Sequence, residues 1–404
     1  MTTTTTNMCI FYSAIDIEYP GAHGGSTHVA ETVNALQELG HSVILACKHT
    51  KGQKFIEKKG SLKIYRIPIF FNSGILKMIS VFKMSFWFYL LIFLTNRIDI
   101  VWARARIFGF AEAFWSSLFM KKMILEMNEP LIEAAEESGK FKNNFLFSLL
   151  KAFFLFNISK ADLITVTHSS MAKKLPKNKS LLIDYGANYK VFNPLVSGTE
   201  QIIKKYNLKK GKTVLYSGSF REWHGLNSII DSAEKVIAKD KEIKFLLLGN
   251  GPEFEKIEGK IKQKNLQENV FLLGKIPYSK TPSYVNASDI CLALFSPEYP
   301  LFKKFSYFYS PLKVHEYKAM GKAVVATKLG NLEKLVVNGE NGFLVENNDS
   351  QKVADSIMKL AGDSVLRKKI SEQNIKEIKE HYNWVSITKN ILMNLRDKEC
   401  GLSK

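Results

Sequence analysis

Cysteine is scarce in this 404-residue chain, and the four cysteines do not form pairs. Cys9, Cys47, Cys291 and Cys400 lie far apart, and no Cys-x-x-Cys motif occurs. This spacing argues against a zinc site and against a disulfide framework, and it fits a protein of the reducing cytosol. The first seven residues, mostly threonine, lack the basic start and apolar centre of a signal peptide, so we expect a loose tail there.

Acidic residues are also few relative to basic ones. The chain has 57 Lys and Arg against 38 Asp and Glu, a formal charge of +19. This charge predicts attraction to an anionic membrane surface, a phosphorylated substrate or nucleic acid. The lysines are spread over both halves and no aromatic–basic recognition motif occurs, so we expect no nucleic-acid partner. The length and a hydrophobic content of 46% suit two domains, each with its own core.

A long uninterrupted apolar run is missing as well. Residues 75–94 are strongly apolar, but Lys77 and Lys83 interrupt them, and the eleven residues after Lys83 fall short of the roughly 20 that a membrane span needs. We expect a buried helix, with an interfacial helix whose lysines meet lipid headgroups as the alternative. Residues 141–156 repeat the pattern. The expected location is the cytoplasm, with peripheral association at the inner face of the cell membrane left open.

Acidic metal-binding motifs are lacking too. The nearest approach to Asp-x-Asp is Asp16-Ile-Glu18, which we interpret as loop solvation, and no histidine cluster accompanies it. We therefore expect neither a metal nor another cofactor.

The most informative stretch that is present reads Ser-Pro-Leu-Lys-Val-His-Glu-Tyr-Lys-Ala-Met-Gly and spans residues 310–321. Its pattern predicts a helix that Pro311 opens, because a first-turn position needs no N–H, and that Gly321 ends. A short β-branched strand, residues 323–326, follows at once.

The charged residues of this helix predict an anion site. Lys313 and Glu316 are three residues apart and share one helix face. Beside the backbone amides of residues 311–313, they would suit a diphosphate and a sugar hydroxyl. An ordinary helix with a surface ion pair is the alternative.

Glycine-rich loops follow predicted strands in both halves of the chain. Gly24 and Gly25 stand between the first strand and a helix, where they would let a ligand approach the backbone closely. In the second half, a strand at residues 213–217 leads into a loop from Gly218 to Gly225, and a later buried strand ends at Gly249. Simple tight turns are the alternative for these loops.

Polar residues end two further predicted strands in the first half. One strand runs to Arg104, and the next reaches Asn128 and Glu129. Open α/β sheets place their ligands at the carboxyl ends of their strands. We therefore expect these residues to lie near a ligand.

Together these motifs resemble the donor and acceptor sites of the retaining nucleotide-sugar glycosyltransferases of family four, which have the GT-B fold. The chain departs from the usual family pattern at four positions. Phe308 stands where the family has the first of two glutamates, and Asn128 where it often has a histidine. Ser219 and His224 replace an arginine and a lysine that clamp the diphosphate. Arg221 lies in the same loop and could supply the missing charge.

The resemblance implies an α/β chain of two Rossmann-like domains facing each other across a cleft. Residues 1–195 would bind the acceptor and residues 196–383 the nucleotide sugar, while residues 384–404 form a helix that returns toward the first domain. The implied reaction is transfer of a sugar to a saccharide or lipid-linked acceptor, with retention of configuration, in the assembly of cell-surface polysaccharide, glycolipid or glycoprotein glycans.

The resemblance also assigns roles to residues. The expected catalytic residues are Asn128, Arg221, Lys313 and Glu316. The expected donor-binding residues are Gly24, Gly25, Ser219, His224, Gly249, Ile276, Ser310, Pro311 and Leu312. The expected acceptor-side residues are His28, Arg104 and Glu129.

Two alternatives use the same pocket without glycosyl transfer. An epimerase of the GT-B fold would act on the nucleotide sugar alone. A non-catalytic module would bind the nucleotide sugar without turnover, as the missing motif residues would allow.

Overall fold

A computed structural model describes residues 7–21, 24–71, 74–137, 139 and 144–399. The chain divides into two compact units: unit 1 comprises Met1–Asp184 and Trp384–Lys404, and unit 2 comprises Tyr185–Asn383. The predicted tail at residues 1–7 lies outside the described residues except for Asn7.

The division between the units falls before Tyr185, eleven residues earlier than the boundary we expected after residue 195. The backbone explains the shift. The Tyr185 amide donates to Ser310 Oγ at 2.8 Å, and Ala187 forms a parallel β-bridge with Asn383. Residues 185–187 are thus bonded within unit 2.

Unit 1 is built on one sheet, which has eight strands among the described residues in the order β3-β4-β2-β1-β5-β6-β7-β8. The pairs are parallel except for the antiparallel pair of β3 with β4. Its central strands are continuous apolar runs because helices cover both faces. The strands are β1 Cys9–Glu18, β2 Ser42–Lys48, β3 Ile56–Lys59, β4 Leu62–Ile67, β5 Ile100–Arg104, β6 Lys122–Met127, β7 Leu163–Val166 and β8 Ser180–Leu182.

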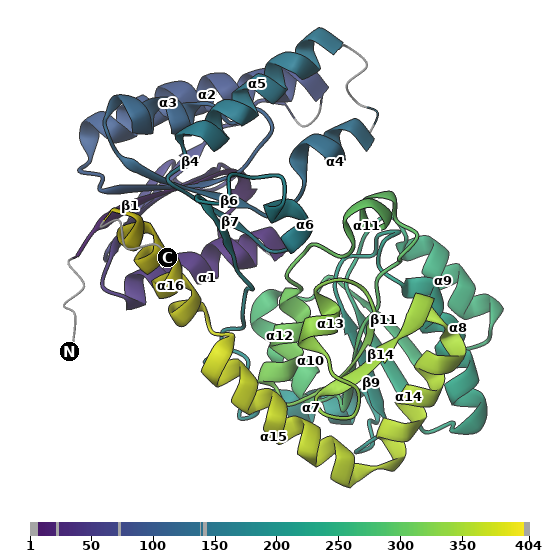
Figure 1. Ribbon diagram of the computed structural model, residues 1–404. Helices are drawn as coiled ribbons and strands as arrows, with labels where there is room; N and C mark the ends of the chain where they lie inside the picture. Colours follow the sequence, from purple (N-terminus) through teal and green to yellow (C-terminus); the bar gives the residue numbers. More distant parts are fainter. Residues whose placement is uncertain (1–6, 22–23, 72–73, 138, 140–143, 400–404) are drawn as a thin grey trace. The chain divides into compact units, whose positions relative to one another are not determined.

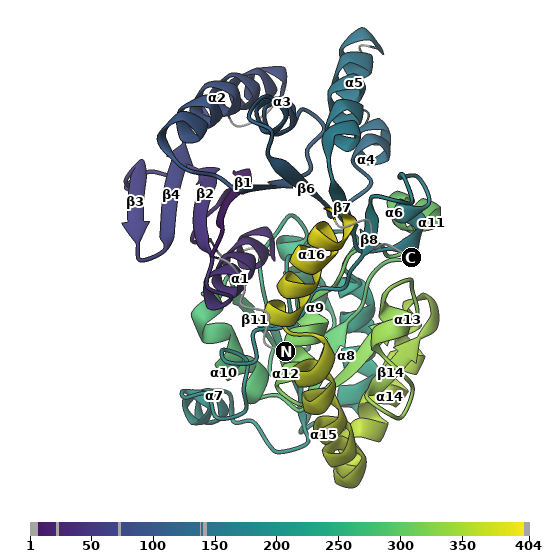
Figure 2. The ribbon, with the colours of Figure 1, turned by 60° about the vertical axis from the view of Figure 1, so that its left-hand side comes forward.

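The helices of unit 1 form a layer on each face of this sheet. Figures 1 and 2 show α2, α3 and α5 over one face and α1 and α16 over the other. The C-terminal helix α16 belongs to unit 1 and packs on α1 and β7. The helices are α1 Gly24–Glu38, α2 Gly74–Thr95, α3 Ala111–Leu118, α4 Leu131–Glu137, α5 Asn144–Lys160, α6 Ser169–Ala172 and α16 Trp384–Glu399.

Helix α2 differs from our first expectation. Its segment Leu76–Thr95 is long and apolar enough to cross a bilayer by length and composition, although the core helix of a soluble protein can pass the same test. Lys77 and Lys83 lie within the continuous helix. Of the most apolar 18-residue stretch of this helix, 33% is buried. The prediction of a plainly buried helix was therefore wrong. Of the similar segment 141–156, the structure describes the part in α5.

Unit 2 has a parallel sheet of six strands among the described residues, in the order β11-β10-β9-β12-β13-β14. The strands are β9 Thr213–Ser217, β10 Lys244–Leu248, β11 Val270–Gly274, β12 Ile290–Ala293, β13 Ala323–Thr327 and β14 Gly342–Val345. The helices are α7 Thr199–Tyr206, α8 Leu226–Lys239, α9 Phe254–Gln263, α10 Thr281–Asn286, α11 Pro300–Phe305, α12 Leu312–Ala319, α13 Leu332–Leu335, α14 Ser350–Gly362 and α15 Ser364–His381, with short 3-10 turns at Tyr278–Lys280 and Glu346–Asn348.

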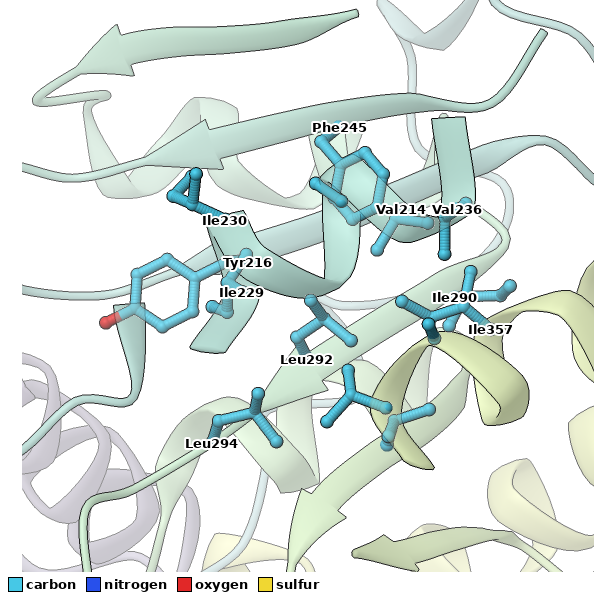
Figure 3. Packing of buried hydrophobic residues seen from close by; sticks show 14 of the residues in the cluster. Val214, Tyr216, Ile229, Ile230, Val236, Phe245, Ile290, Leu292, Leu294 and Ile357 are labelled. Atoms are coloured by element: carbon cyan, nitrogen blue, oxygen red, sulfur yellow. The ribbon is translucent and has the colours of Figure 1, made fainter. Parts of the chain in front are cut away.

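The core of unit 2 positions its candidate site. Side chains from β9, β10 and β12 pack against α8 and α14, including Val214, Phe245, Leu292 and Ile357 (Figure 3). Tyr216 joins this cluster with its ring, and its hydroxyl points away from the other labelled side chains. The rigid core thus holds a polar atom at the edge where β9 ends.

Candidate active site

The expected helix begins directly after Pro311, whose φ of −81° and ψ of 93° place it at the N-cap of α12. Because proline has no N–H, the amides of Leu312 and Lys313, and not that of residue 311, can bind an anion here. The helix is shorter than expected: Met320 is its C-cap, and Gly321 follows with φ +66°. Residues Ala323–Thr327 form the predicted strand.

Lys313 carries a buried ammonium. Its Nζ atom is fully buried and has no hydrogen-bond partner among the described residues. It lies 4.3 Å from the centre of the Tyr216 ring and 5.2 Å from that of Phe295. Burial lowers the pKa of Lys313 to about 7, although Glu316 raises it in part. A desolvated cation over two aromatic faces is stabilised by them and by the charge of Glu316, but burial still outweighs both.

The glycine loop after β9 lies directly beside this ammonium. Gly218 has φ +158°, and a Cβ added there would lie 2.5 Å from Lys313 Nζ. Gly249 has φ +141°, and its Cβ would lie 1.8 Å from the Gly218 carbonyl oxygen. Any side chain would therefore separate the two loops. Gly249 is therefore required by close backbone contact, whereas the nearest atom to a Cβ on Gly218 is the end of the Lys313 side chain.

His224 is uncharged in this loop. Burial lowers the pKa of its ring well below the usual value, and the charges of Lys313 and Arg221 lower it further. Its Nδ1 bonds the Ser219 carbonyl oxygen and lies 3.3 Å from Ser219 Oγ. Two cations and burial therefore oppose protonation of the His224 ring.

Arg221 is exposed, and its guanidinium carbon lies 5.1 Å from the centre of the Trp223 ring. Its charge lowers the pKa of His224, so it acts electrostatically on the other side chains of this loop. The structure does not bury it beside the Lys313 ammonium. The two cations expected to bind the diphosphate therefore differ in environment: Arg221 lies over Trp223 in contact with solvent, whereas the Lys313 ammonium is buried.

Glu316 is oriented by a residue that the sequence did not single out. The Tyr278 hydroxyl donates to Glu316 Oε1 at 3.0 Å, and the Tyr278 ring lies 5.6 Å from that of Phe192. Tyr278 follows the end of β11 by four residues, and Ile276, an expected donor-binding residue, lies half-buried between them. A tyrosine after a strand gives no signal of this contact.

Two other expected positions have structural roles. Ser310 Oγ accepts the Tyr185 amide and lies 3.4 Å from His315 Nε2, so these contacts engage the hydroxyl. Phe308, which stands in place of the family glutamate, is fully buried, with its ring centre 4.5 Å from that of Tyr309 and 5.7 Å from that of Phe302. An aromatic cluster thus occupies the position of the missing carboxylate.

Unit 1 gathers Asn128 and two of the expected acceptor-side residues, His28 and Arg104, around a carboxylate that we had not chosen. Glu126, 1% exposed, lies in β6 beside Arg104 in the parallel register with β5. Its Oε1 accepts from Arg104 Nη1 at 2.9 Å and from Asn128 Nδ2 at 2.7 Å. Its Oε2 accepts from the Tyr12 hydroxyl and from Trp102 Nε1, each at 3.1 Å. Burial raises the pKa of Glu126, but the charge of Arg104 and the hydrogen bonds from His28 and Asn128 outweigh it and hold the pKa well below its usual range.

The ring of His28 is held in one tautomer. Arg104 Nη1 lies 3.2 Å from His28 Nδ1, and an arginine can only donate, so Nδ1 accepts. Nε2 then carries the hydrogen and faces Glu126 Oε2 at 3.4 Å. Burial lowers the pKa of the ring, which is therefore neutral. Trp384 of α16 lies against it, with 5.1 Å between ring centres.

The remaining expected residues of unit 1 lie at strand and helix ends. Gly24 and Gly25 begin α1, and a Cβ on Gly24 would meet no described atom within 4 Å. Glu129 is half-buried and follows β6 by two residues. Among the described residues, no group of three His, Cys, Asp or Glu side chains could hold a metal ion.

Comparison with known proteins identifies the family. The sequence model described as "Glycosyl transferases group 1" matches residues 198–377, and that described as "Glycosyltransferase Family 4" matches residues 22–180. The uncharacterized glycosyltransferase MJ1069 of Methanocaldococcus jannaschii is 27% identical over 381 residues, 90% of this chain and 92% of the relative. The N-acetyl-alpha-D-glucosaminyl L-malate synthase of Bacillus anthracis is 23% identical over 231 residues, 56% of this chain and 57% of the relative.

Solved structures share the fold. The sucrose-phosphate synthase of Thermosynechococcus elongatus has a TM-score of 0.75 at 17% identity, covering 98% of this chain and all of that one. The Anabaena protein HepE, in complex with UDP and glucose, has a TM-score of 0.72 at 16% identity, covering 96% of this chain and all of that one. With both units Rossmann-like and both family models matched, the chain belongs to the group 1, family four glycosyltransferases of the GT-B fold, and it is a glycosyltransferase.

Proposed function

We propose that this glycosyltransferase takes its sugar from a nucleoside-diphosphate sugar bound by unit 2 and transfers it, with retention of configuration, to a saccharide or lipid-linked acceptor bound by unit 1. Assembly of cell-surface polysaccharide, glycolipid or glycoprotein glycans is the proposed setting. The buried Lys313 ammonium carries the donor half of this proposal.

The Lys313 ammonium favours an anionic ligand for an electrostatic reason. A buried cation without a hydrogen-bond partner destabilises the protein unless something compensates it, and a diphosphate supplies charge and acceptor oxygens at once. The amides of Leu312 and Lys313 at the start of α12 add donors to the same place. As the diphosphate leaves with the nucleotide, these groups would stabilise the charge that develops on it.

Calorimetric titration with nucleoside diphosphates tests the donor half. UDP is the first choice because the HepE structure holds it, and ADP and GDP complete the panel. Lys313→Met keeps the apolar stem and removes the charge, so we expect affinity to fall on the order of 10- to 100-fold. Lys328→Met, which removes an exposed lysine of the same unit, is the control and should bind as the wild type does. Equal affinity in all three proteins would overturn the proposed phosphate site.

Product analysis tests the reaction itself. NMR of the product formed from an α-linked donor should show an α-linkage if configuration is retained, and a β-linkage would overturn retention. Incubation with the nucleotide sugar alone separates transfer from epimerisation: a changed sugar without acceptor would favour the epimerase. Tight binding with no turnover on any acceptor would favour the non-catalytic module.

We also propose that unit 1 associates peripherally with an anionic membrane from the cytoplasmic side. The exposed residues Leu76, Ile79, Lys83, Trp87, Leu91 and Leu94 recur every three or four positions along α2, so they form one stripe. Trp87 is 65% exposed and Leu94 66%. An apolar stripe that contains a lysine, on a chain of charge +19, is complementary to an anionic lipid surface.

Vesicle sedimentation tests the membrane proposal. The protein should sediment with vesicles that contain phosphatidylglycerol and much less with pure phosphatidylcholine, and Trp87→Ser with Leu91→Ser should weaken the binding. Val365→Ser removes an apolar side chain that is 79% exposed in unit 2 and is the control. Negligible binding to both vesicles would overturn the proposal without touching the donor site.

A further inference from the structure

The buried carboxylate of Glu126 accepts hydrogen bonds both from the core of the sheet and from a residue at the sheet edge. Tyr12 and Trp102 donate to it from within β1 and β5, which suffices to hold it in the core. Asn128 donates to it from beyond the end of β6, at the carboxyl edge of the sheet where α/β folds bind ligands. The carboxylate thus connects the core to a half-buried side chain at that edge.

Glu126 determines which end of the Asn128 amide faces the sheet. An ionised carboxylate only accepts hydrogen bonds, so the amide nitrogen of Asn128 must face it and the amide oxygen is turned the other way. The low pKa of Glu126 keeps the carboxylate ionised over the working range. The flip of the amide is therefore fixed by charge.

We infer that Glu126 is a positioning residue for glycosyl transfer: it aims Asn128 Oδ1, as a hydrogen-bond acceptor, at a hydroxyl of the transferred sugar or of the saccharide acceptor. The inference rests on the proposed function. An amide does not titrate in the useful range, so Asn128 recognises the hydroxyl and takes no proton from it. His28 and Arg104 complete the positioning, because His28 Nε2 lies 3.4 Å from Glu126 Oε2 and Arg104 Nη1 donates to Glu126 Oε1 at 2.9 Å.

Reversing the polarity of the Glu126–Asn128 pair tests the inference. Asn128→Asp places a second carboxyl at hydrogen-bond distance from Glu126, so the two share a proton and the pKa of the pair rises. The protonated form still donates to Glu126. We expect turnover of this variant to fall by roughly tenfold or more between about pH 5.5 and pH 8 as the proton is lost, a fall that the wild type should not show over the same range.

The double variant Glu126→Gln/Asn128→Asp restores a donor–acceptor pair in the opposite sense. The new carboxamide donates to the new carboxylate at any pH, so the steep pH dependence should disappear. Turnover at about pH 8 should recover in part relative to Asn128→Asp, because the amide nitrogen also faces the Arg104 Nη1 donor. A residue that only supported the fold would give no such recovery. Trp102→Phe removes another donor to the same carboxylate without touching Asn128, and it is the control that should keep the wild-type pH profile.

Thermal unfolding gives a readout that does not depend on activity. In Asn128→Asp the folded-state pKa is raised, so the folded state binds more protons than the unfolded one and stability should fall as pH rises. The double variant should lose this trend. If the trend appears but the pH profile of turnover stays as in the wild type, or if the double variant does not recover, the positioning role is overturned. A wild type without transferase activity would instead overturn the proposed function, and this inference with it.

Discussion

The ammonium of Lys313 lies 4.3 Å from the centre of the Tyr216 ring, and a Cβ on Gly218 would lie 2.5 Å from it. Tyr216 is held by the core of unit 2, and its hydroxyl donates to the Ser219 carbonyl oxygen at 2.8 Å. One tyrosine thus supports both the cation and the glycine loop beside it. The loop and the charge are therefore positioned by the same rigid element.

Nucleoside diphosphate binding should take up protons near neutral pH. The pKa of Lys313 is about 7 in the free protein, and a bound diphosphate should raise it. Affinity should then fall as pH rises above about 7, approaching tenfold per pH unit until the pKa of the complex is reached. Calorimetry in buffers of different ionisation enthalpy measures the uptake. Lys313→Met should abolish it, and uptake that persists in this variant would point to another group.

Arg221→Ala should weaken donor binding less than Lys313→Met does. The Arg221 guanidinium is exposed against Trp223, so water and salt screen its attraction to phosphate. We expect a loss of only a few-fold that shrinks at high salt, whereas the loss in Lys313→Met should change little with salt. Titrations at low and high sodium chloride compare the two. A larger, salt-independent loss in Arg221→Ala would show that this arginine moves into contact with the diphosphate.

Gly249→Ala should impair donor use with little effect on the rest of the fold. The new methyl group would lie 1.8 Å from the Gly218 carbonyl oxygen, at a φ of +141° that alanine rarely adopts. The loop beside Lys313 must then shift, so we expect the donor KM to rise on the order of tenfold or more, as a displaced binding group implies. Gly259→Ala in α9 meets nothing within 4 Å and is the matched control. Equal KM values in the two variants would contradict the requirement for close contact.

Tyr278→Phe should reduce donor use through Glu316. The variant keeps the ring against Phe192 and removes the hydrogen bond of 3.0 Å to Glu316 Oε1. A hydrogen bond to a charged group contributes roughly 1.5–3 kcal/mol, so kcat/KM for the nucleotide sugar should fall about 10- to 100-fold. Binding of the free nucleoside diphosphate should stay nearly unchanged, because Glu316 is expected to contact sugar hydroxyls. A parallel loss of diphosphate affinity would contradict that assignment.

The ends of the central helix, the strand after it and the pairing of charges on its surface could be predicted from the sequence. Pro311 and Gly321 bound the central helix, and β-branched residues follow as a strand, because these features depend on neighbours in the sequence. The pairing of Lys313 with Glu316 on one face follows from helical periodicity. The family resemblance, which the comparisons confirm, rests on these same short motifs.

Charge states and contacts between distant residues could not be predicted in this way. The pKa of His224 is lowered by burial and by the charges of Lys313 and Arg221, and its loop sequence does not show the burial. Glu126 was not singled out from the sequence, because its partners come from two strands, β1 and β5, and from helix α1, which are separated by many residues. Burial and dielectric are properties of the packed unit, so no local pattern reports them.

The sequence by itself determined that this protein is a two-unit α/β glycosyltransferase, since strand, loop and helix signals are local and carry the family motifs. Only the tertiary structure decided where unit 2 begins, that Tyr278 orients Glu316, and that Lys313 is a desolvated cation with a pKa of about 7. It also decided that Glu126 holds Asn128 in one orientation. The physical reason is that desolvation and hydrogen-bond direction depend on which residues fold together, whatever their distance along the chain.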